Sequence, residues 1–103
     1  MPTRVEWHGG AREDFARLDK TQQQRIADAV GRLRLQDDAR LRLVPYAENL
    51  KGFWKLRVGD YRLVCELRRD TEGQVVLIIH VVHRSKAYLA RSVRTVHGRA
   101  NDN

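Results

Sequence analysis

Cationic side chains recur at alternate positions within residues 50–64, which read LKGFWKLRVGDYRLV. The pattern predicts two strands joined by a Gly59–Asp60 turn. Successive side chains of a strand point to opposite faces, so Lys55, Arg57 and Arg62 would share one face of a sheet. Cations that converge on one face can hold a phosphate and stabilise negative charge on it, or can meet an acidic partner. The alternative is that these charges keep an exposed strand soluble and protect a sheet edge.

A second group of reactive side chains follows the most apolar segment of the chain. Residues 83–88, HRSKAY, place the His83 imidazole, the Arg84 guanidinium and the Tyr88 phenol close together. Alternation puts residues 76, 78, 80, 82 and 84 in phase, so we expect Arg84 to emerge beside Arg62. Arginine stays protonated at ordinary pH, which favours charge stabilisation over acid catalysis for Arg84. His83 would shuttle protons only if the strand end turns it inward, and Tyr88 alone is more often a packing residue.

Other kinds of site have little support in the sequence. His8, His80 and His97 do not cluster with acids or cysteine, so the sequence predicts no metal site. Neither a glycine-rich phosphate loop nor a Ser-His-Asp arrangement is present. The single Cys65 lies inside an expected strand, and a buried, unreactive thiol is the expected state.

The composition is that of a soluble protein with an uneven positive charge. The 103 residues predict one domain, 1–103, with a core over 3–90 and a C-terminal segment over 91–103. The net charge of +7 lies mostly in the second half: residues 51–103 hold eleven basic and five acidic side chains, against nine and eight in residues 1–50. Sixteen of the twenty basic residues are arginine, whose fork suits phosphate. With neither an apolar run of about 20 residues nor an apolar signal core, we expect a cytoplasmic protein away from membranes. We expect a monomer when it is free, because Arg-rich faces repel each other.

The elements that must position these residues follow from hydrophobic periodicity. The expected elements are a strand at 3–7, helices at 11–18 and from 21 to about 35, strands at 53–58, 61–68 and 75–82, and a possible helix at 85–96 followed by a frayed tail from 98. Thr21 and Gln24 suggest a capping box, and Pro45 marks an irregular connector. The order predicts an α+β domain with a mainly antiparallel four-stranded sheet. The helical hairpin would cover one sheet face and leave the other open.

Three segments resemble the RelE branch of the RelE/ParE toxin superfamily. They read VEWHGGAREDFARLDKTQQQRIADAVGRL, LKGFWKLRVGDYRLVCEL and VVLIIHVVHRSKAY, and together span about residues 3–90. The resemblance implies the toxin of a type II toxin–antitoxin pair, an endonuclease without a cofactor that cuts mRNA in the ribosomal A site. Its implied partners are an acidic antitoxin, the ribosome and mRNA, with a toxin–antitoxin hetero-oligomer in the complex.

The resemblance also implies roles for individual residues. Lys55 matches a lysine that contacts phosphate or helps to deprotonate the attacking 2′-hydroxyl. Arg62 matches an arginine that stabilises the phosphorane, Arg84 one near the leaving 5′-oxygen, and Tyr88 a tyrosine that orients the nucleophile. A second family lysine falls on Phe53, which we expect to stack on a base instead. Residues expected to contact the RNA around this centre are Lys51, Phe53, Arg57, His83 and Lys86.

Two other functions stay open at this point. A ParE-like toxin would inhibit DNA gyrase without cutting nucleic acid, although such a binder has no chemical need for Lys55, Arg84 and Tyr88. A purely binding member of the superfamily would use the cationic sheet to hold an acidic antitoxin segment.

Overall fold

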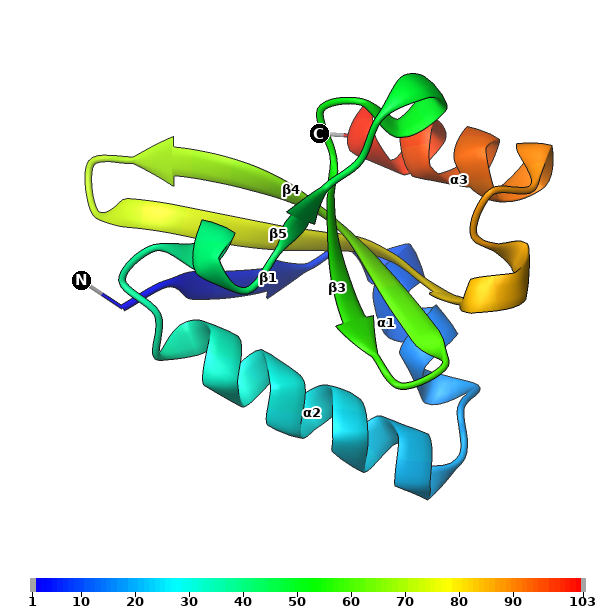
Figure 1. The fold of residues 1–103 in the computed structure, drawn as a ribbon, viewed down its shortest axis with the longest axis horizontal. Coiled ribbons are helices and arrows are strands. Elements are labelled where there is room, and N and C mark those ends of the chain that lie inside the picture. Colours follow the sequence, from blue (N-terminus) through cyan, green and yellow to red (C-terminus); the bar gives the residue numbers. More distant parts are fainter. Residues whose placement is uncertain (1, 103) are drawn as a thin grey trace.

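A computed structural model of the chain describes residues 2–102. Within that range the chain forms one mixed sheet with helices on both faces (Figure 1). The strands are β1 (Arg4–Trp7), β2 (Val44–Pro45), β3 (Trp54–Val58), β4 (Tyr61–Asp70) and β5 (Gly73–His83). The helices are α1 (Gly9–Ala16), α2 (Lys20–Arg34) and α3 (Ala90–Ala100), with short 3₁₀ turns at Ala39–Leu41, Glu48–Leu50 and Arg84–Lys86.

The sheet confirms the α+β class and adds one strand to the expected four. Its order is β1-β5-β4-β3-β2, with β1 parallel to β5 and all other neighbours antiparallel. The extra strand is the Val44–Pro45 segment, which the sequence analysis treated as irregular. It pairs with Lys55 and Trp54 of β3. Pro45 is tolerated there because β2 is an edge strand, where a missing N–H breaks no interior ladder.

The first two helices cover one face of the sheet, as the apolar periodicity predicts. The stripe on α2 is buried and consists of Ile26, Ala29, Val30 and Leu33. It packs in one core with inward side chains of the hairpin and of β5, namely Leu56, Leu63, Cys65, Val76 and Ile78. Alternation along β3 and β4 therefore correctly identifies the helix-facing residues.

The opposite face is not open, and this prediction was wrong. Helix α3 lies across it, on the other side of the sheet from α2 (Figure 1). A second core forms beneath α3 from Leu50, Phe53, Val64, Leu77, Ile79 and Val96. His97 fixes the helix further by donating from Nε2 to the Asn49 carbonyl at 2.7 Å. The chain from 98 to 100 is therefore part of a docked helix and not a frayed tail.

Both N-terminal helix starts differ from the sequence expectation by a few residues. The helix α1 begins at Gly9, because the His8 side chain accepts a hydrogen bond from the Gly10 N–H. At α2, Asp19 is the N-cap and accepts from the Gln22 N–H at 2.8 Å. The Asp19 carboxylate at the N-cap satisfies a first-turn N–H donor, so the expected Thr21 capping box is not used.

A bulge in β5 changes which of its side chains face the two cores. Val64 pairs with His80 while Cys65 pairs with Ile78, so Ile79 is an extra residue on β5. Ile78 faces α1 and α2, whereas His80 reaches α3. The expectation that residues 76 to 84 stay in phase was therefore wrong, because the bulge turns the second half of the strand over.

None of the helices in the described part of the chain has the length and apolar character needed to span a membrane.

Candidate functional site

Lys55 and Tyr88 come together through a residue that the sequence analysis did not select. The Lys55 Nζ lies 5.2 Å from the centroid of the Tyr46 ring, which is cation–π geometry. The Tyr88 ring meets the same Tyr46 ring edge-on, with centroids 6.0 Å apart. Lys55 lies on β3, Tyr46 directly after β2, and Tyr88 just before α3. The Tyr46 ring thus links a cation and an exposed phenol that are 33 residues apart in sequence.

Tyr46 is the buried centre of this group. Its side chain is almost fully enclosed, and its hydroxyl oxygen has no hydrogen-bond partner among the described residues. Burial raises the pKa of the Tyr46 phenol, while the nearby Arg62 charge lowers it by a smaller amount. The phenol therefore stays protonated, and Arg62 is close enough for its charge to be felt there.

Arg62 and Arg84 are both hydrogen-bonded to the Gly59–Asp60 turn. Arg62 donates from Nη1 to the carbonyls of Gly59 and Tyr61, each at 2.9 Å. The backbone N–H of Arg84 donates to the Asp60 carbonyl at 2.8 Å, and its Nε lies 3.5 Å from Asp60 Oδ1. Gly59 adopts a positive φ of 57°, a conformation that favours glycine and lets the turn close this tightly. The turn therefore holds the guanidinium of Arg62 and the backbone of Arg84.

Arg57 and Arg62 are direct neighbours across β3 and β4. Like charges placed opposite each other on a sheet destabilise it by a few tenths of a kcal/mol or more. Arg57 also lines a groove of about 320 Å³, whose α2 side carries Arg25, Arg32 and the acidic Asp28. An anion bound beside this pair would relieve the repulsion.

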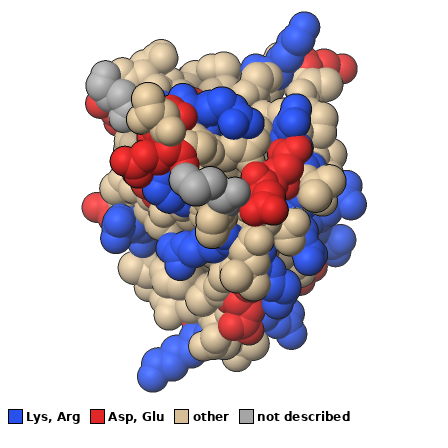
Figure 2. Space-filling model, turned by 90° about the vertical axis from the view of Figure 1, so that its left-hand side faces the viewer, with Lys and Arg blue, Asp and Glu red and all other residues tan. Residues whose placement is uncertain are grey.

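Three ion pairs lie near the end of the molecule where β4 turns into β5. There Arg4 pairs with Asp70, while Arg40 pairs with Asp38 and Arg68 with Glu66, both at 2.9 Å. Figure 2 views the side that carries this turn and shows acidic and basic side chains interspersed.

Away from that turn, several cations lack such partners. Within residues 2–102, the cationic side chains with no carboxylate oxygen within 4.0 Å include Lys55, Arg57, Arg62, Lys86 and Arg91, together with others on all three helices. Part of the unpaired positive charge therefore lies around the end of the β3–β4 hairpin and the start of α3.

Two of the residues expected to contact RNA are placed differently from that expectation. Phe53 is buried beneath α3, with its ring 5.4 Å from that of His97, so it presents no face on which a base could stack. His83 is the cross-strand neighbour of Tyr61 and lies against its ring, on the opposite sheet face from Arg62. Its Nδ1 accepts from the Ser85 N–H at 3.2 Å, which ties the ring to its own 3₁₀ turn. The strand end does not turn His83 inward.

Lys51 and Lys86 remain exposed at the positions that flank the site. Lys51 ends the 3₁₀ turn before β3, and Lys86 ends the 3₁₀ turn after β5. Lys86 and Arg84 belong to the same turn, so this short segment carries two cations past the end of the sheet.

A buried polar network at the edge of β5 was also missed from sequence. Asp14 of α1 accepts from the Arg99 Nη1 at 2.7 Å and from the Val81 N–H at 3.1 Å, and lies 3.1 Å from His80 Nδ1. Burial alone would raise the Asp14 pKa, but the bonds from His80, Arg99 and Val81 outweigh it and lower the pKa below 3.8. The network joins α1, β5 and α3. Asp14 and Arg99 are 85 residues apart in sequence, so no local sequence pattern predicts their contact.

Cys65 and the metal-binding residue types show no reactive arrangement in the described chain. Cys65 is a free, fully buried cysteine, and burial raises the pKa of its thiol to about 12. Within residues 2–102, no three His, Cys, Asp or Glu side chains are grouped as metal ligands.

Comparison with known proteins identifies a family. Residues 5–88 match the family model described as the ParE toxin of the type II toxin–antitoxin system parDE. A search of curated proteins gives no match.

Three solved structures are similar in fold. The toxin–antitoxin complex RelBE2 from Mycobacterium tuberculosis is 32% identical, with 82% of this chain and 100% of that chain covered and a TM-score of 0.56. An archaeal RelE–RelB complex from Pyrococcus horikoshii OT3 is 21% identical over 84% of this chain and 100% of that chain, with a TM-score of 0.60. A double-arginine mutant of the Escherichia coli toxin RelE in the free state is 18% identical over 96% and 98%, with a TM-score of 0.65. The chain belongs to the RelE/ParE superfamily and is a toxin of a type II toxin–antitoxin system.

Proposed function

We propose that this toxin is a ribosome-dependent endoribonuclease that cuts mRNA in the ribosomal A site. The observation that carries the proposal is the grouping of Lys55, Tyr46 and Tyr88 beside Arg62. A toxin that acts only by binding another protein has no need of a cation, a phenol and a guanidinium around one buried aromatic ring.

The RNA itself supplies the nucleophile in this reaction. Its 2′-oxygen bonds to the adjacent phosphorus while the bond from phosphorus to the 5′-oxygen breaks. The 2′-hydroxyl loses a proton and the 5′-oxygen gains one, which leaves a 2′,3′-cyclic phosphate and a 5′-hydroxyl. The protein has to align the attack, move the protons and stabilise charge on the phosphate.

Each of the four matched residues has a role in that scheme. Lys55 contacts the phosphate or assists deprotonation of the 2′-hydroxyl, and Tyr88 orients that hydroxyl. Arg62 stabilises the pentavalent phosphorane, and Arg84 stabilises charge that develops on the leaving 5′-oxygen. Lys51, Arg57 and Lys86 bind the RNA backbone on either side. His83 and Phe53 are left out, because neither side chain faces this group.

The cognate antitoxin is the second partner that we propose. The similar structures from Mycobacterium tuberculosis and Pyrococcus horikoshii OT3 are toxin–antitoxin complexes. A net charge of +7 would attract an acidic antitoxin segment, and the unpaired cations around the hairpin are its natural contact.

One observation favours a second candidate function. The matching family model describes ParE toxins, and a ParE-like gyrase inhibitor would use the same cationic surface to bind its target. Such a toxin would bind DNA gyrase and leave RNA intact.

Two assays on the purified toxin separate the candidates. The first is primer extension on an mRNA translated in a purified system, with ribosome-free mRNA as the control. The second is DNA supercoiling by gyrase. RNA cuts that need ribosomes, with normal supercoiling, support the endoribonuclease. Intact mRNA together with blocked supercoiling would replace it with the ParE-like function.

A further inference from the structure

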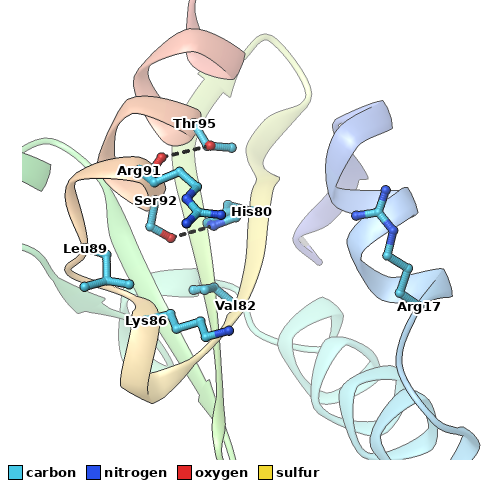
Figure 3. A pocket seen from close by; sticks show the side chains of 8 residues that line it. All are labelled: Arg17, His80, Val82, Lys86, Leu89, Arg91, Ser92 and Thr95. Carbon is cyan, nitrogen blue, oxygen red and sulfur yellow. Dashed lines mark hydrogen bonds between the residues drawn. The ribbon is translucent and has the colours of Figure 1, made fainter.

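A cavity of about 400 Å³ opens between α3, the second half of β5 and the end of α1. Figure 3 shows it from close by, with α3 on one side and Arg17, the C-cap of α1, on the other. Its wall consists mainly of Arg17, Val82, Lys86, Arg91, Ser92 and Thr95. None of these residues belongs to the Lys55, Tyr46 and Tyr88 group.

The cavity wall is positively charged. Arg17, Lys86 and Arg91 come from three separate elements, and the lining residues include no acid. Lys86 and Arg91 have no carboxylate within 4.0 Å in the described chain. Arg17 makes only a 3.9 Å contact with Asp14, and its side chain is 76% exposed. Cations around a concave wall focus a positive potential, so the complementary ligand is an anion.

The remaining wall supplies hydrogen-bond acceptors and an apolar surface. Thr95 Oγ1 donates to the Arg91 carbonyl at 3.0 Å and keeps lone pairs that can accept. Ser92 is buried, with its Oγ 2.9 Å from His80 Nε2, and also retains acceptor capacity (Figure 3). Val82 and the half-exposed Leu89 contribute apolar surface. A bare inorganic anion would use only the cations, whereas a nucleotide would also use the acceptors for its hydroxyl or base N–H groups.

The cavity adjoins the proposed cleavage centre. Val82, on its wall, is the direct cross-strand neighbour of Arg62, and Lys86 follows Arg84 in the same turn. We propose that the cavity binds one nucleotide of the RNA strand, next to the nucleotides that flank the cut, with its phosphate held by Arg17, Lys86 and Arg91. This assignment rests on the proposed function, since it places the RNA strand across Arg62.

Two double variants with equal loss of charge test the assignment. R17A/R91A removes cations from two walls of the cavity, while R12A/R94A removes exposed arginines from the same two helices outside it. The probe is a fluorescent hexauridine RNA that carries 2′-O-methyl groups and therefore cannot be cut. We expect R17A/R91A to weaken RNA binding about tenfold and R12A/R94A to weaken it about twofold or less. The reason is that direct hydrogen bonds from arginine to a phosphate contribute more binding free energy than the long-range attraction of a distant charge. An equal loss of RNA affinity in the two double variants, both folded, would overturn the assignment.

Chemical-shift changes in the wild-type protein provide a test that needs no variant. Uridine monophosphate should shift the backbone amide signals of Ser92 and Thr95 at lower concentration than inorganic phosphate does. Equal responses to both would reduce the cavity to a general anion site and overturn the nucleotide assignment. A response to an acidic peptide but not to the nucleotide would assign the cavity to a protein partner.

The outcome is separable from that of the proposed function. If the toxin cuts no mRNA but the cavity still prefers the nucleotide, the cleavage proposal fails and the binding site stands. If mRNA is cut but the cavity does not bind the nucleotide in preference to phosphate, only the cavity assignment fails.

Discussion

The ammonium group of Lys55 lies 5.2 Å from the centroid of the Tyr46 ring, and the same ring meets Tyr88 edge-on. Tyr46 is buried, whereas Tyr88 is 66% exposed. A rigid ring beneath two more mobile side chains limits the directions they can take. In the proposed mechanism, Tyr46 would therefore position Lys55 and Tyr88 from beneath and would not contact the RNA itself.

This relationship predicts different effects for two substitutions of Tyr46. Tyr46→Phe keeps the ring and removes a buried hydroxyl that has no partner among the described residues, so it should retain cleavage and stabilise the fold by up to about 1 kcal/mol. Tyr46→Ala should lower the cleavage rate by about tenfold or more, because Lys55 and Tyr88 lose their support. Denaturant unfolding and single-turnover cleavage measure the two effects. Similar activity in the Ala and Phe variants, both folded, would show that Tyr46 does not position the site.

Much of the fold and of the candidate site follows from short-range patterns in the sequence. The rest depends on long-range contacts that such patterns do not encode. Alternation correctly assigned Leu63 and Cys65 to the face beneath α2. It failed for His80, because a bulge one residue earlier cannot be recognised from residue types alone. The apolar residues Phe53 and Val64 on the face expected to be open are the sequence signal for a covering helix there. Tyr46 was missed because it follows Pro45 in a segment without periodicity.

Burial of Phe53 beneath α3 predicts a structural role for this residue. Phe53→Ala should lower the free energy of unfolding by about 3–5 kcal/mol, and Phe53→Leu by about 1 kcal/mol. Cleavage by the folded Leu variant should match the wild type, since the ring contacts His97 and the core beneath α3. Chemical denaturation and the cleavage assay check both statements. A stable Leu variant with weakened RNA binding would restore the base-stacking role.

The two adjacent glycines of α1 form a matched pair for the contact between α1 and α3. A Cβ on Gly10 would overlap the Arg99 guanidinium, whereas a Cβ on Gly9 has open space. Arg99 is held by Asp14 and by the Ile79 carbonyl, so it cannot move aside without losing these bonds. Gly10→Ala should destabilise the fold by about 1–3 kcal/mol, and Gly9→Ala should change it by less than about 1 kcal/mol. Thermal unfolding of the two variants makes the comparison, and equal stabilities would argue against a fixed Arg99.

The lowered pKa of Asp14 predicts how stability depends on pH. Because its pKa is lower in the folded state than its ordinary 3.8, the unfolded chain binds the proton more readily. The stabilisation is therefore complete above about pH 4–5 and is lost progressively as the pH falls below that range. Asp14→Asn should cost about 2–3 kcal/mol at pH 7 and weaken the dependence below pH 4.

Urea unfolding between pH 2 and pH 7 tests this, with the exposed Glu13→Gln as the control on the same helix. If Asp14→Asn keeps the full acid sensitivity of the wild type, other carboxylates are responsible.

The central claim is tested most directly by the rate at which mRNA is cut in programmed ribosomes. Wild-type toxin would be compared with R62A/R84A, and with R34A/R42A, which removes the same charge from exposed positions outside the site. We predict that R62A/R84A loses at least about 10²-fold in single-turnover rate while it stays folded, because these groups stabilise the charge on the phosphate. R34A/R42A should cut within about threefold of the wild type. Equal rates for the two double variants, or no cutting by the wild type, would contradict the account.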